Sequence, residues 1–247
     1  STTPDPLTPA RTWFAQRNWQ PFPFQQQVWS AYLSNKSGLL HAPTGMGKTF
    51  AVAMGPLLEE LALREAGAAK KRERGLKLLW LTPLRALAND TAEALTSAVE
   101  GLGLNWSVEL RTGDTAQSKK RKQRTDGLPN ILVTTPESLS VMLSYPDLAV
   151  STPGEPSPLA GIRAVIVDEW HELLGTKRGV QTELGLARVR AMNPSVRTWG
   201  LSATLGNLEE AMSVLLGPAG AKARVMVKGL GRRRYDFHTV IPPDIER

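Results

Sequence analysis

Residues 39–50, LLHAPTGMGKTF, join a short apolar run to a glycine-containing turn that ends in a lysine and a threonine. Backbone N–H groups in such a turn can surround an anion, and the following helix directs the positive end of its dipole to the same point. Lys48 would reach the β- and γ-phosphates of a nucleotide, and the Thr49 hydroxyl would bind Mg²⁺. The residues of this predicted phosphate cradle are Thr44, Gly45, Met46, Gly47, Lys48, Thr49 and Phe50.

The cradle departs from the common pattern G-x-x-x-x-G-K-[ST] at its first position, which is Ala42. A glycine-rich turn before an ordinary helix is the alternative interpretation. Because Gly47, Lys48 and Thr49 all hold their places in the pattern, we favour a nucleotide site.

Residues 164–174, AVIVDEWHELL, supply the carboxylates that phosphate chemistry requires. A buried strand would place Asp168 at its carboxyl end, where open α/β sheets bind ligands. Asp168 would hold the metal ion, directly or through water, and Glu169 would be the base that orients the attacking water. His171 is suited to sensing the γ-phosphate, although a plain histidine at a helix start is the alternative.

The tetrapeptide LSAT, residues 201–204, ends a strand that should lie beside the nucleotide-binding strand. The hydroxyls of Ser202 and Thr204 could there hydrogen-bond to His171 or to the carboxylates. Such contacts would couple the nucleotide state to another surface of the domain.

Short apolar runs alternate with helical patterns, which predicts an α/β fold with a mostly parallel sheet of about seven strands and helices on both faces. The expected strands are 38–41, 78–82, 106–110, 131–134, 163–167, 197–201 and 223–227. The expected helices are 24–33, 48–65, 84–99, 136–144, 178–191 and 207–216.

Composition limits the class of protein. The chain of 247 residues contains no cysteine, which excludes disulfides and thiolate metal sites and fits a reducing cytoplasm. No run of 18 apolar residues and no signal peptide is visible, so we expect a soluble, cytoplasmic protein without a membrane partner. The net charge is +7, and basic residues cluster at 70–74, 119–124 and 232–234, which suits either a polyanion or solvated loops.

Domain boundaries follow from the same patterns. We expect an N-terminal extension at 1–23, a nucleotide-binding domain at 24–228 and a linker at 229–247. Residues 66–77 and the proline-rich segment 144–161 predict loops.

The order of these motifs resembles the first RecA-like domain of superfamily 2 DExH-box helicases, and more narrowly the large helicase-related (Lhr) group with its ligase-associated helicases. The matching segments are FQQQVWSAY (24–32), GLLHAPTGMGKT (38–49), TPLRALAND (82–90), RTGDT (111–115), ILVTTPESL (131–139), VDEWHELLGTKRGVQTELGLARVR (167–190) and RTWGLSATLGNLEEA (197–211). The resemblance therefore extends over most of the chain.

The resemblance implies roles for further residues. Gln25 matches the Q motif, whose amide reads the adenine edge, while Trp19, Phe22 and Arg17 are candidates for stacking on the base. Three short motifs would lie along one strand of nucleic acid and contact it mainly through phosphates. Their residues are Pro83, Leu84 and Arg85, then Gly113, Asp114 and Thr115, then Thr135, Pro136 and Glu137; capping and turn formation are the alternative roles.

The family also implies an activity. It suggests the ATP-binding lobe of a 3′–5′ helicase or translocase that uses ATP and Mg²⁺, acts on single-stranded DNA or RNA, and serves DNA repair. A second RecA-like domain would supply an arginine finger, so the isolated lobe should be a weak ATPase. A DNA ligase and a nuclease are the implied partners. The alternatives are a stand-alone nucleotide-gated nucleic-acid-binding module and another kind of P-loop NTPase.

Overall fold

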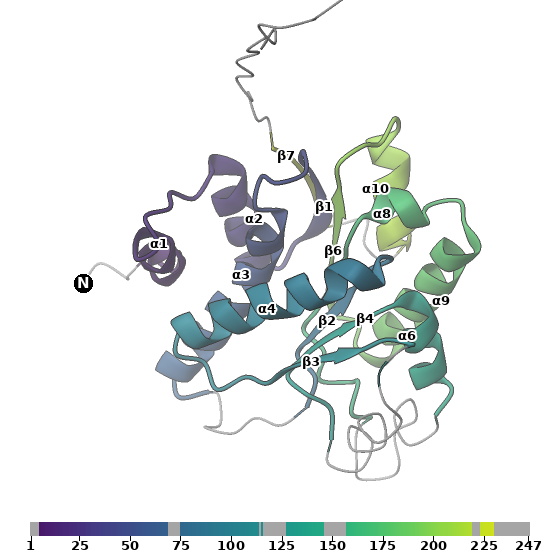
Figure 1. Ribbon diagram of the computed structural model, residues 1–247, viewed down its shortest axis with the longest axis horizontal. Helices are drawn as coiled ribbons and strands as arrows, with labels where there is room; N and C mark the ends of the chain where they lie inside the picture. The colour runs from purple at the N-terminus through teal and green to yellow at the C-terminus, as the bar shows by residue number, and fades with distance from the viewer. Residues whose placement is uncertain are drawn as a thin grey trace, which may run out of the picture.

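The computed structural model describes residues 5–68, 75–113, 115, 127–145, 157–218 and 223–229. Within these residues, seven strands form one sheet in the order β3-β4-β2-β5-β6-β1-β7, and neighbouring strands are parallel (Figure 1). The strands are β1 (Ser37–His41), β2 (Leu78–Leu81), β3 (Val108–Arg111), β4 (Ile131–Thr134), β5 (Ala164–Val167), β6 (Arg197–Ser202) and β7 (Arg224–Lys228). The sheet confirms the predicted parallel α/β class.

Helices cover both faces of the sheet (Figure 1). They are α1 (Thr8–Ala15), α2 (Pro23–Leu33), α3 (Lys48–Glu65), α4 (Arg85–Gly101), α6 (Pro136–Leu143), α8 (Trp170–Leu173), α9 (Lys177–Met192) and α10 (Leu208–Leu216). The core on one face combines residues of α1, α2, α3 and α4, and the core on the other combines residues of α6, α8, α9 and α10. The domain is therefore a three-layer sandwich.

Successive side chains of each strand point to opposite faces of the sheet, which produces these two cores. In β2, Leu78 and Trp80 pack with α1 to α4, whereas Leu79 and Leu81 pack with the opposite helices. All four residues of β2 are buried, as are all four of β4 and of β5. Central parallel strands are apolar on both sides for this reason, and they appear in the sequence as continuous apolar runs.

Two helices were absent from the sequence prediction. Helix α1 lies in the segment expected to be an N-terminal extension, yet its Trp13 and Phe14 are buried in the core. Pro9 lies in its first turn, where backbone N–H groups have no partner within the helix. The missing N–H of proline therefore costs nothing there, and Pro9 is compatible with the start of a helix. Helix α8 has only four residues, which is too short for a helical period to be visible.

Strand β3 also differs from its expected range of 106–110, because it begins at Val108 and ends at Arg111. Trp106 precedes the strand and is buried in the core, so its apolar character reflects packing and not membership of the strand. No helix among the described residues is long and apolar enough to cross a membrane. The expected basic clusters at 70–74, 119–124 and 232–234 lie outside the described residues, as do most of the expected linker 229–247 and Asp114.

Candidate functional site

The predicted phosphate cradle lies between β1 and α3, at the carboxyl edge of the sheet. Gly47 is the residue before the helix and has a φ of 72°, a left-handed conformation that glycine adopts without strain. An added Cβ at Gly47 would lie 2.8 Å from Nε2 of Gln25, so a larger residue would also meet that side chain. Helix α3 then begins at Lys48, which directs the start of the helix toward the cradle.

Gln25 ties the cradle to helix α2. Its Oε1 accepts a hydrogen bond from the Phe22 N–H at 2.8 Å, and its Nε2 donates to the Gly47 carbonyl at 3.0 Å. The side chain is 1% exposed. The observed role of Gln25 is to hold the loop. Its Nε2 carries a second hydrogen that could be donated to the adenine base, so a role in reading adenine stays a prediction.

The two predicted carboxylates follow β5 and face the cradle. Lys48 Nζ lies 3.6 Å from Glu169 Oε1, and Glu169 Oε2 lies 3.4 Å from Nδ1 of His171. The Glu169 N–H donates to Asp168 Oδ1 at 2.9 Å. The structure thus brings together all four residues predicted for the chemical step.

Glu169 has an unusual backbone conformation. Its φ of 44° is positive, which is uncommon for a residue other than glycine and costs about 1–3 kcal/mol. Strain of this kind concentrates at functional sites, because the surrounding structure must enforce it. The strained turn places the Glu169 carboxylate opposite Lys48, which explains why the chain adopts it.

Burial changes the acidity of Asp168. Desolvation, followed by the negative charge of Glu169, raises the pKa of this carboxyl from 3.8 to about 6, while the Glu169 N–H and Lys48 act in the opposite direction. A bound cation would favour the ionised form, because it supplies the positive charge that the protein only partly provides. Asp168 is therefore suited to hold a metal ion.

The polar atoms of this site fit a nucleotide with its metal ion. Lys48 Nζ, Glu169 Oε2 and His171 Nδ1 are buried and have no hydrogen-bond partner among the described residues. Buried polar groups are normally paired, so this group of side chains can accept a charged ligand beside it, while Glu169 already lies within ion-pair distance of Lys48 and His171. The described residues contain no group of three or more His, Cys, Asp or Glu that could hold a metal ion alone.

The predicted coupling residues lie next to the cradle. Strand β6 pairs with β1, and the Ala42 N–H donates to the Ser202 carbonyl at 3.0 Å. The Ser202 hydroxyl lies 3.5 Å from the Thr204 carbonyl, and Thr204 is exposed. Contacts from these hydroxyls to His171 remain a prediction.

The three short motifs meet at the carboxyl ends of β2, β3 and β4, which are neighbours in the sheet. A Cβ at Gly113 would lie 2.8 Å from Nη2 of Arg85, so the first two motifs are in contact. Thr135 accepts a hydrogen bond from the Ser138 N–H and caps α6. Leu84 and Arg85 are exposed, whereas Thr135 and Pro136 are buried.

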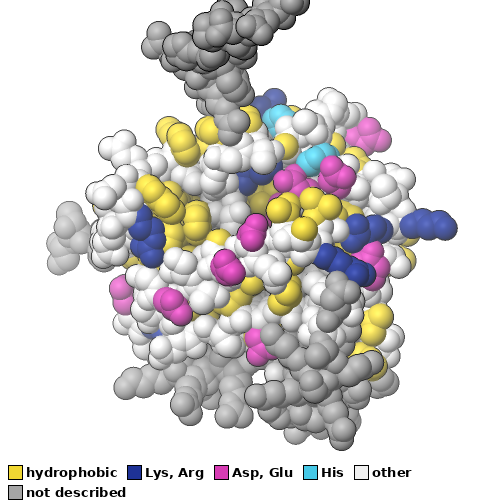
Figure 2. All heavy atoms as spheres, viewed as in Figure 1, with side chains coloured by type: hydrophobic (Ala, Val, Ile, Leu, Met, Phe, Trp, Pro, Cys, Tyr) yellow, Lys and Arg dark blue, Asp and Glu magenta, His cyan; other side chains and the backbone are white. Residues whose placement is uncertain are grey.

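Figure 2 shows where the charged side chains lie on one face of the molecule. Histidine side chains, drawn in cyan, lie close to acidic and basic side chains in this view. The edge that carries the cradle therefore combines both signs of charge.

A family model for DEAD/DEAH box helicases matches residues 22–211. The chain belongs to this family. This helicase domain is 34% identical over 258 residues to the Lhr helicase/uracil glycosylase of Escherichia coli (strain K12), which covers 98% of this chain and 16% of the relative. It is also 34% identical over 220 residues to the ATP-dependent helicase Lhr-Core of Methanocaldococcus jannaschii, which covers 85% of this chain and 24% of the relative.

A solved structure of the Mycobacterium smegmatis helicase Lhr, bound to single-stranded DNA and AMP-PNP, has a similar fold. Its TM-score is 0.74 at 31% identity, and the match covers 94% of this chain and 29% of that chain. The helicase domain thus has the RecA-like fold and corresponds to the first lobe of Lhr-type ATP-dependent helicases. It spans less than a third of each relative named here.

His41 is a further candidate site residue of this helicase domain, which the sequence motifs did not indicate. It ends β1, directly before the cradle, and pairs in register with Ser202 on one side and Lys228 on the other. Its Nδ1 is buried without a hydrogen-bond partner in the described part of the chain. Burial, then the nearby charges of Lys228 and Lys48, lower the pKa of His41. The position of His41, at the end of a predicted strand and directly before the cradle, could have indicated that it lies at the site.

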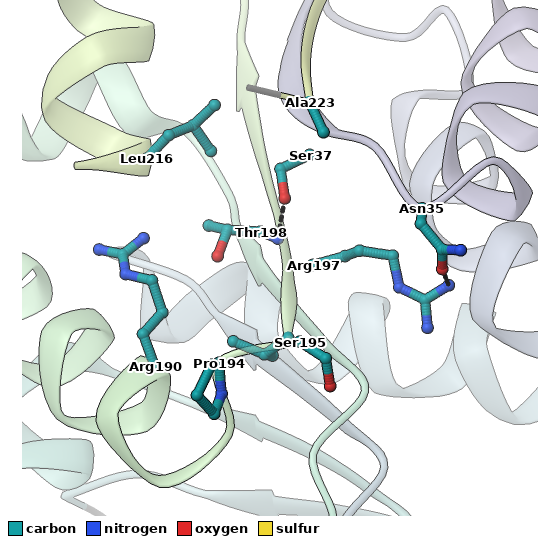
Figure 3. Close-up of a pocket in the computed structure, with 10 residues that line it drawn as sticks. Asn35, Ser37, Arg190, Pro194, Ser195, Arg197, Thr198, Leu216 and Ala223 are labelled. Atoms are coloured by element: carbon teal, nitrogen blue, oxygen red, sulfur yellow. Dashed lines mark hydrogen bonds between the residues drawn. The ribbon is translucent and has the colours of Figure 1, made fainter. Parts of the chain in front are cut away.

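A separate cavity of about 380 Å³ lies at the amino-terminal ends of β1, β6 and β7 (Figure 3). Arg197 and Arg190 line it, but both guanidinium groups have structural partners. Arg197 Nη2 contacts both Glu59 oxygens at 2.6 and 2.8 Å, and Arg190 Nη1 donates to the Leu215 carbonyl at the end of α10. The first contact holds α3 to β6 and the second joins α9 to α10, so both indicate a structural role.

Proposed function

We propose that this chain is the ATP-binding motor lobe of an ATP-dependent nucleic-acid helicase or translocase. The observation that carries the proposal is the buried Lys48, whose ammonium lies 3.6 Å from Glu169 across the phosphate cradle. The phosphate cradle therefore faces Glu169, whose carboxylate could activate a water molecule. Membership of the DEAD/DEAH box helicase family supports the same reading.

Each residue of the site has a distinct role in this proposal. Lys48 and the cradle N–H groups bind the phosphates, and Thr49 with Asp168 hold Mg²⁺, which supplies positive charge to the phosphate oxygens when bound. Glu169 accepts the proton of the attacking water and orients it. His171 lies against Glu169 and can hold that carboxylate in place.

The nucleic acid would lie along the carboxyl ends of β2, β3 and β4. Arg85 offers an exposed cation, while the hydroxyls of Thr115 and Thr135 accept N–H groups of their own turns and shape the backbone there. The nucleotide side occupies β1, β5 and β6, and β2 is hydrogen-bonded to β5 in the sheet. Both ligands would therefore share one edge, and Ser202 and Thr204 would couple them.

Finer features of the proposal are supported by resemblance. The Mycobacterium smegmatis relative was solved with single-stranded DNA and AMP-PNP, which favours DNA over RNA as the partner. Movement in the 3′–5′ direction and a DNA repair role with a ligase and a nuclease are what the Lhr resemblance implies. The residues D-E-W-H at 168–171 support the DExH form of the box, and the absence of cysteine supports a cytoplasmic location. A second RecA-like domain would complete the ATPase site, so this lobe alone would hydrolyse ATP weakly.

A salt titration of single-stranded DNA binding tests the proposed nucleic-acid edge. Arg85→Ala should weaken binding of all sequences similarly and flatten the salt slope by about one unit, as loss of one phosphate contact does. Arg224→Ala is the matched control, because Arg224 is exposed at the start of β7, the outer strand on the far side of the sheet from β3. Equal effects of the two substitutions would contradict the placement.

The alternative function is a stand-alone nucleotide-gated module that grips nucleic acid without unwinding it. The relatives favour a motor, because both are named as helicases. Strand separation by the full-length protein, measured with a forked duplex, distinguishes the two readings. A protein that binds DNA in response to ATP and never separates strands would support the module.

A further inference from the structure

An ion pair joins the first turns of α6 and α9. Arg178 donates from Nε to Glu137 Oε1 at 2.5 Å and from Nη2 to Glu137 Oε2 at 3.3 Å. Two such contacts make the pair bidentate, which fixes the geometry of both side chains. The pair links the segment after the D-E-W-H box to the third of the predicted nucleic-acid motifs, although the residues are 41 positions apart.

Glu137 is an ionised group beside residues that should meet phosphate. Burial raises the pKa of its carboxyl, but hydrogen bonds from Arg178, from its own N–H and from the Thr135 hydroxyl outweigh burial and lower the pKa overall. The carboxylate therefore lies over the first turn of α6 and remains negative. A backbone phosphate near Thr135 would be repelled by this charge if nothing neutralised it.

We propose that Arg178 is a positioning residue for nucleic-acid binding, which acts by neutralising Glu137 and orienting it beside Thr135. The inference rests on the proposed nucleic-acid function of this edge. It changes the role expected for Glu137, which acts through its charge and its ion pair and not as a ligand of the nucleic acid.

The surrounding structure holds Arg178 in position. Thr176 caps α9 by accepting a hydrogen bond from the Gly179 N–H at 3.1 Å. A Cβ at Gly179 would lie 2.1 Å from the Leu173 carbonyl oxygen, so the turn between α8 and α9 is tight. Farther along, Gly185 of α9 packs against Leu139 of α6. The ion pair therefore joins two helices that already pack together.

The proposal is tested with Arg178→Gln, Glu137→Gln and the double variant, by fluorescence anisotropy of a labelled oligothymidylate over a range of salt concentrations. Exposing one like charge at contact distance should weaken binding by Arg178→Gln on the order of tenfold at low salt. Glu137→Gln should bind at least as well as the wild type. The double variant should regain wild-type affinity within about threefold, because both charges are then absent.

Lys177→Gln is the matched control, since it removes a neighbouring exposed positive charge without touching Glu137. Lys177→Gln should weaken oligothymidylate binding less than Arg178→Gln does. Adding Glu137→Gln to Lys177→Gln should not restore any affinity that is lost. An Arg178→Gln defect that persists in the double variant would show a direct phosphate contact and overturn the proposal, as would wild-type binding by Arg178→Gln.

Two readouts separate folding and function. The ion pair is partly exposed, with 37% and 42% of the two side chains accessible, so its loss should leave the unfolding midpoint nearly unchanged. Unfolding of Arg178→Gln at a clearly lower urea concentration would indicate a structural role and overturn the proposal. Failure of the wild type to bind oligothymidylate would overturn the proposed nucleic-acid function itself.

Discussion

Asp168→Asn should stabilise the nucleotide-free protein. Asp168 is 9% exposed, and burial with the charge of Glu169 raises its pKa from 3.8 to about 6. The raised pKa means that the folded state prefers the proton, so folding loses stability as pH rises from the unfolded pKa through the folded one. At roughly 1.4 kcal/mol per pKa unit, the ionised carboxylate costs about 3 kcal/mol at neutral pH and above. Asparagine has the same shape, carries no charge and can still accept the Glu169 N–H.

Urea unfolding in a chelating buffer measures this effect. The stability gain of Asp168→Asn should be about 3 kcal/mol near pH 8 and about 1 kcal/mol near pH 4.5, because the wild-type carboxyl is then mostly protonated in the folded state. The same variant should lose Mg²⁺-dependent nucleotide binding. A variant that is no more stable than the wild type near pH 8, or a gain that does not change with pH, would refute the reasoning.

Three further predictions concern single side chains. Glu169→Gln should bind an ATP analogue normally while phosphate release by the full-length protein falls by about 10²–10⁴, and wild-type turnover would remove Glu169 from the mechanism. Arg197→Met should lower the free energy of unfolding by about 1–3 kcal/mol, because the partly exposed Glu59 loses its ion-pair partner and keeps the hydrogen bond from the Tyr32 hydroxyl; a urea titration showing no loss would contradict this. Gln25→Ala removes the hydrogen bond to the Gly47 carbonyl and should weaken nucleotide binding roughly tenfold by calorimetry, whereas unchanged affinity would mean that the cradle needs no tie to α2.

The sequence was sufficient for the sheet and for the position of the candidate phosphate-binding residues, because both depend on local patterns. Helix α3 occupies 48–65 as expected, and the buried central strands have the continuous apolar runs typical of parallel sheets. The D-E pair follows β5 directly, so strand order places it at the same end of the sheet as Lys48. Parallel strands place such residues at a common edge.

Features that depend on tertiary contacts could not be predicted. Helix α1 is stabilised by the packing of Trp13 and Phe14 in the core, which the proline-rich sequence around it does not reveal. The Arg178–Glu137 pair joins residues far apart in the chain, and no local pattern assigns one to the other. The positive φ of Glu169 likewise results from its surroundings, since glutamate has no preference for that conformation.

Equilibrium binding of a fluorescent ATP analogue in Mg²⁺ tests the central claim most directly. Lys48→Ala removes the buried ammonium that faces Glu169, whereas Lys36→Ala removes an exposed lysine before β1, at the other end of that strand. Loss of a charge-assisted contact of about 1.5–3 kcal/mol predicts roughly 10- to 100-fold weaker binding by Lys48→Ala and no change for Lys36→Ala. Binding of the analogue by Lys48→Ala with wild-type affinity would contradict the assignment of residues 42–49 as the phosphate cradle.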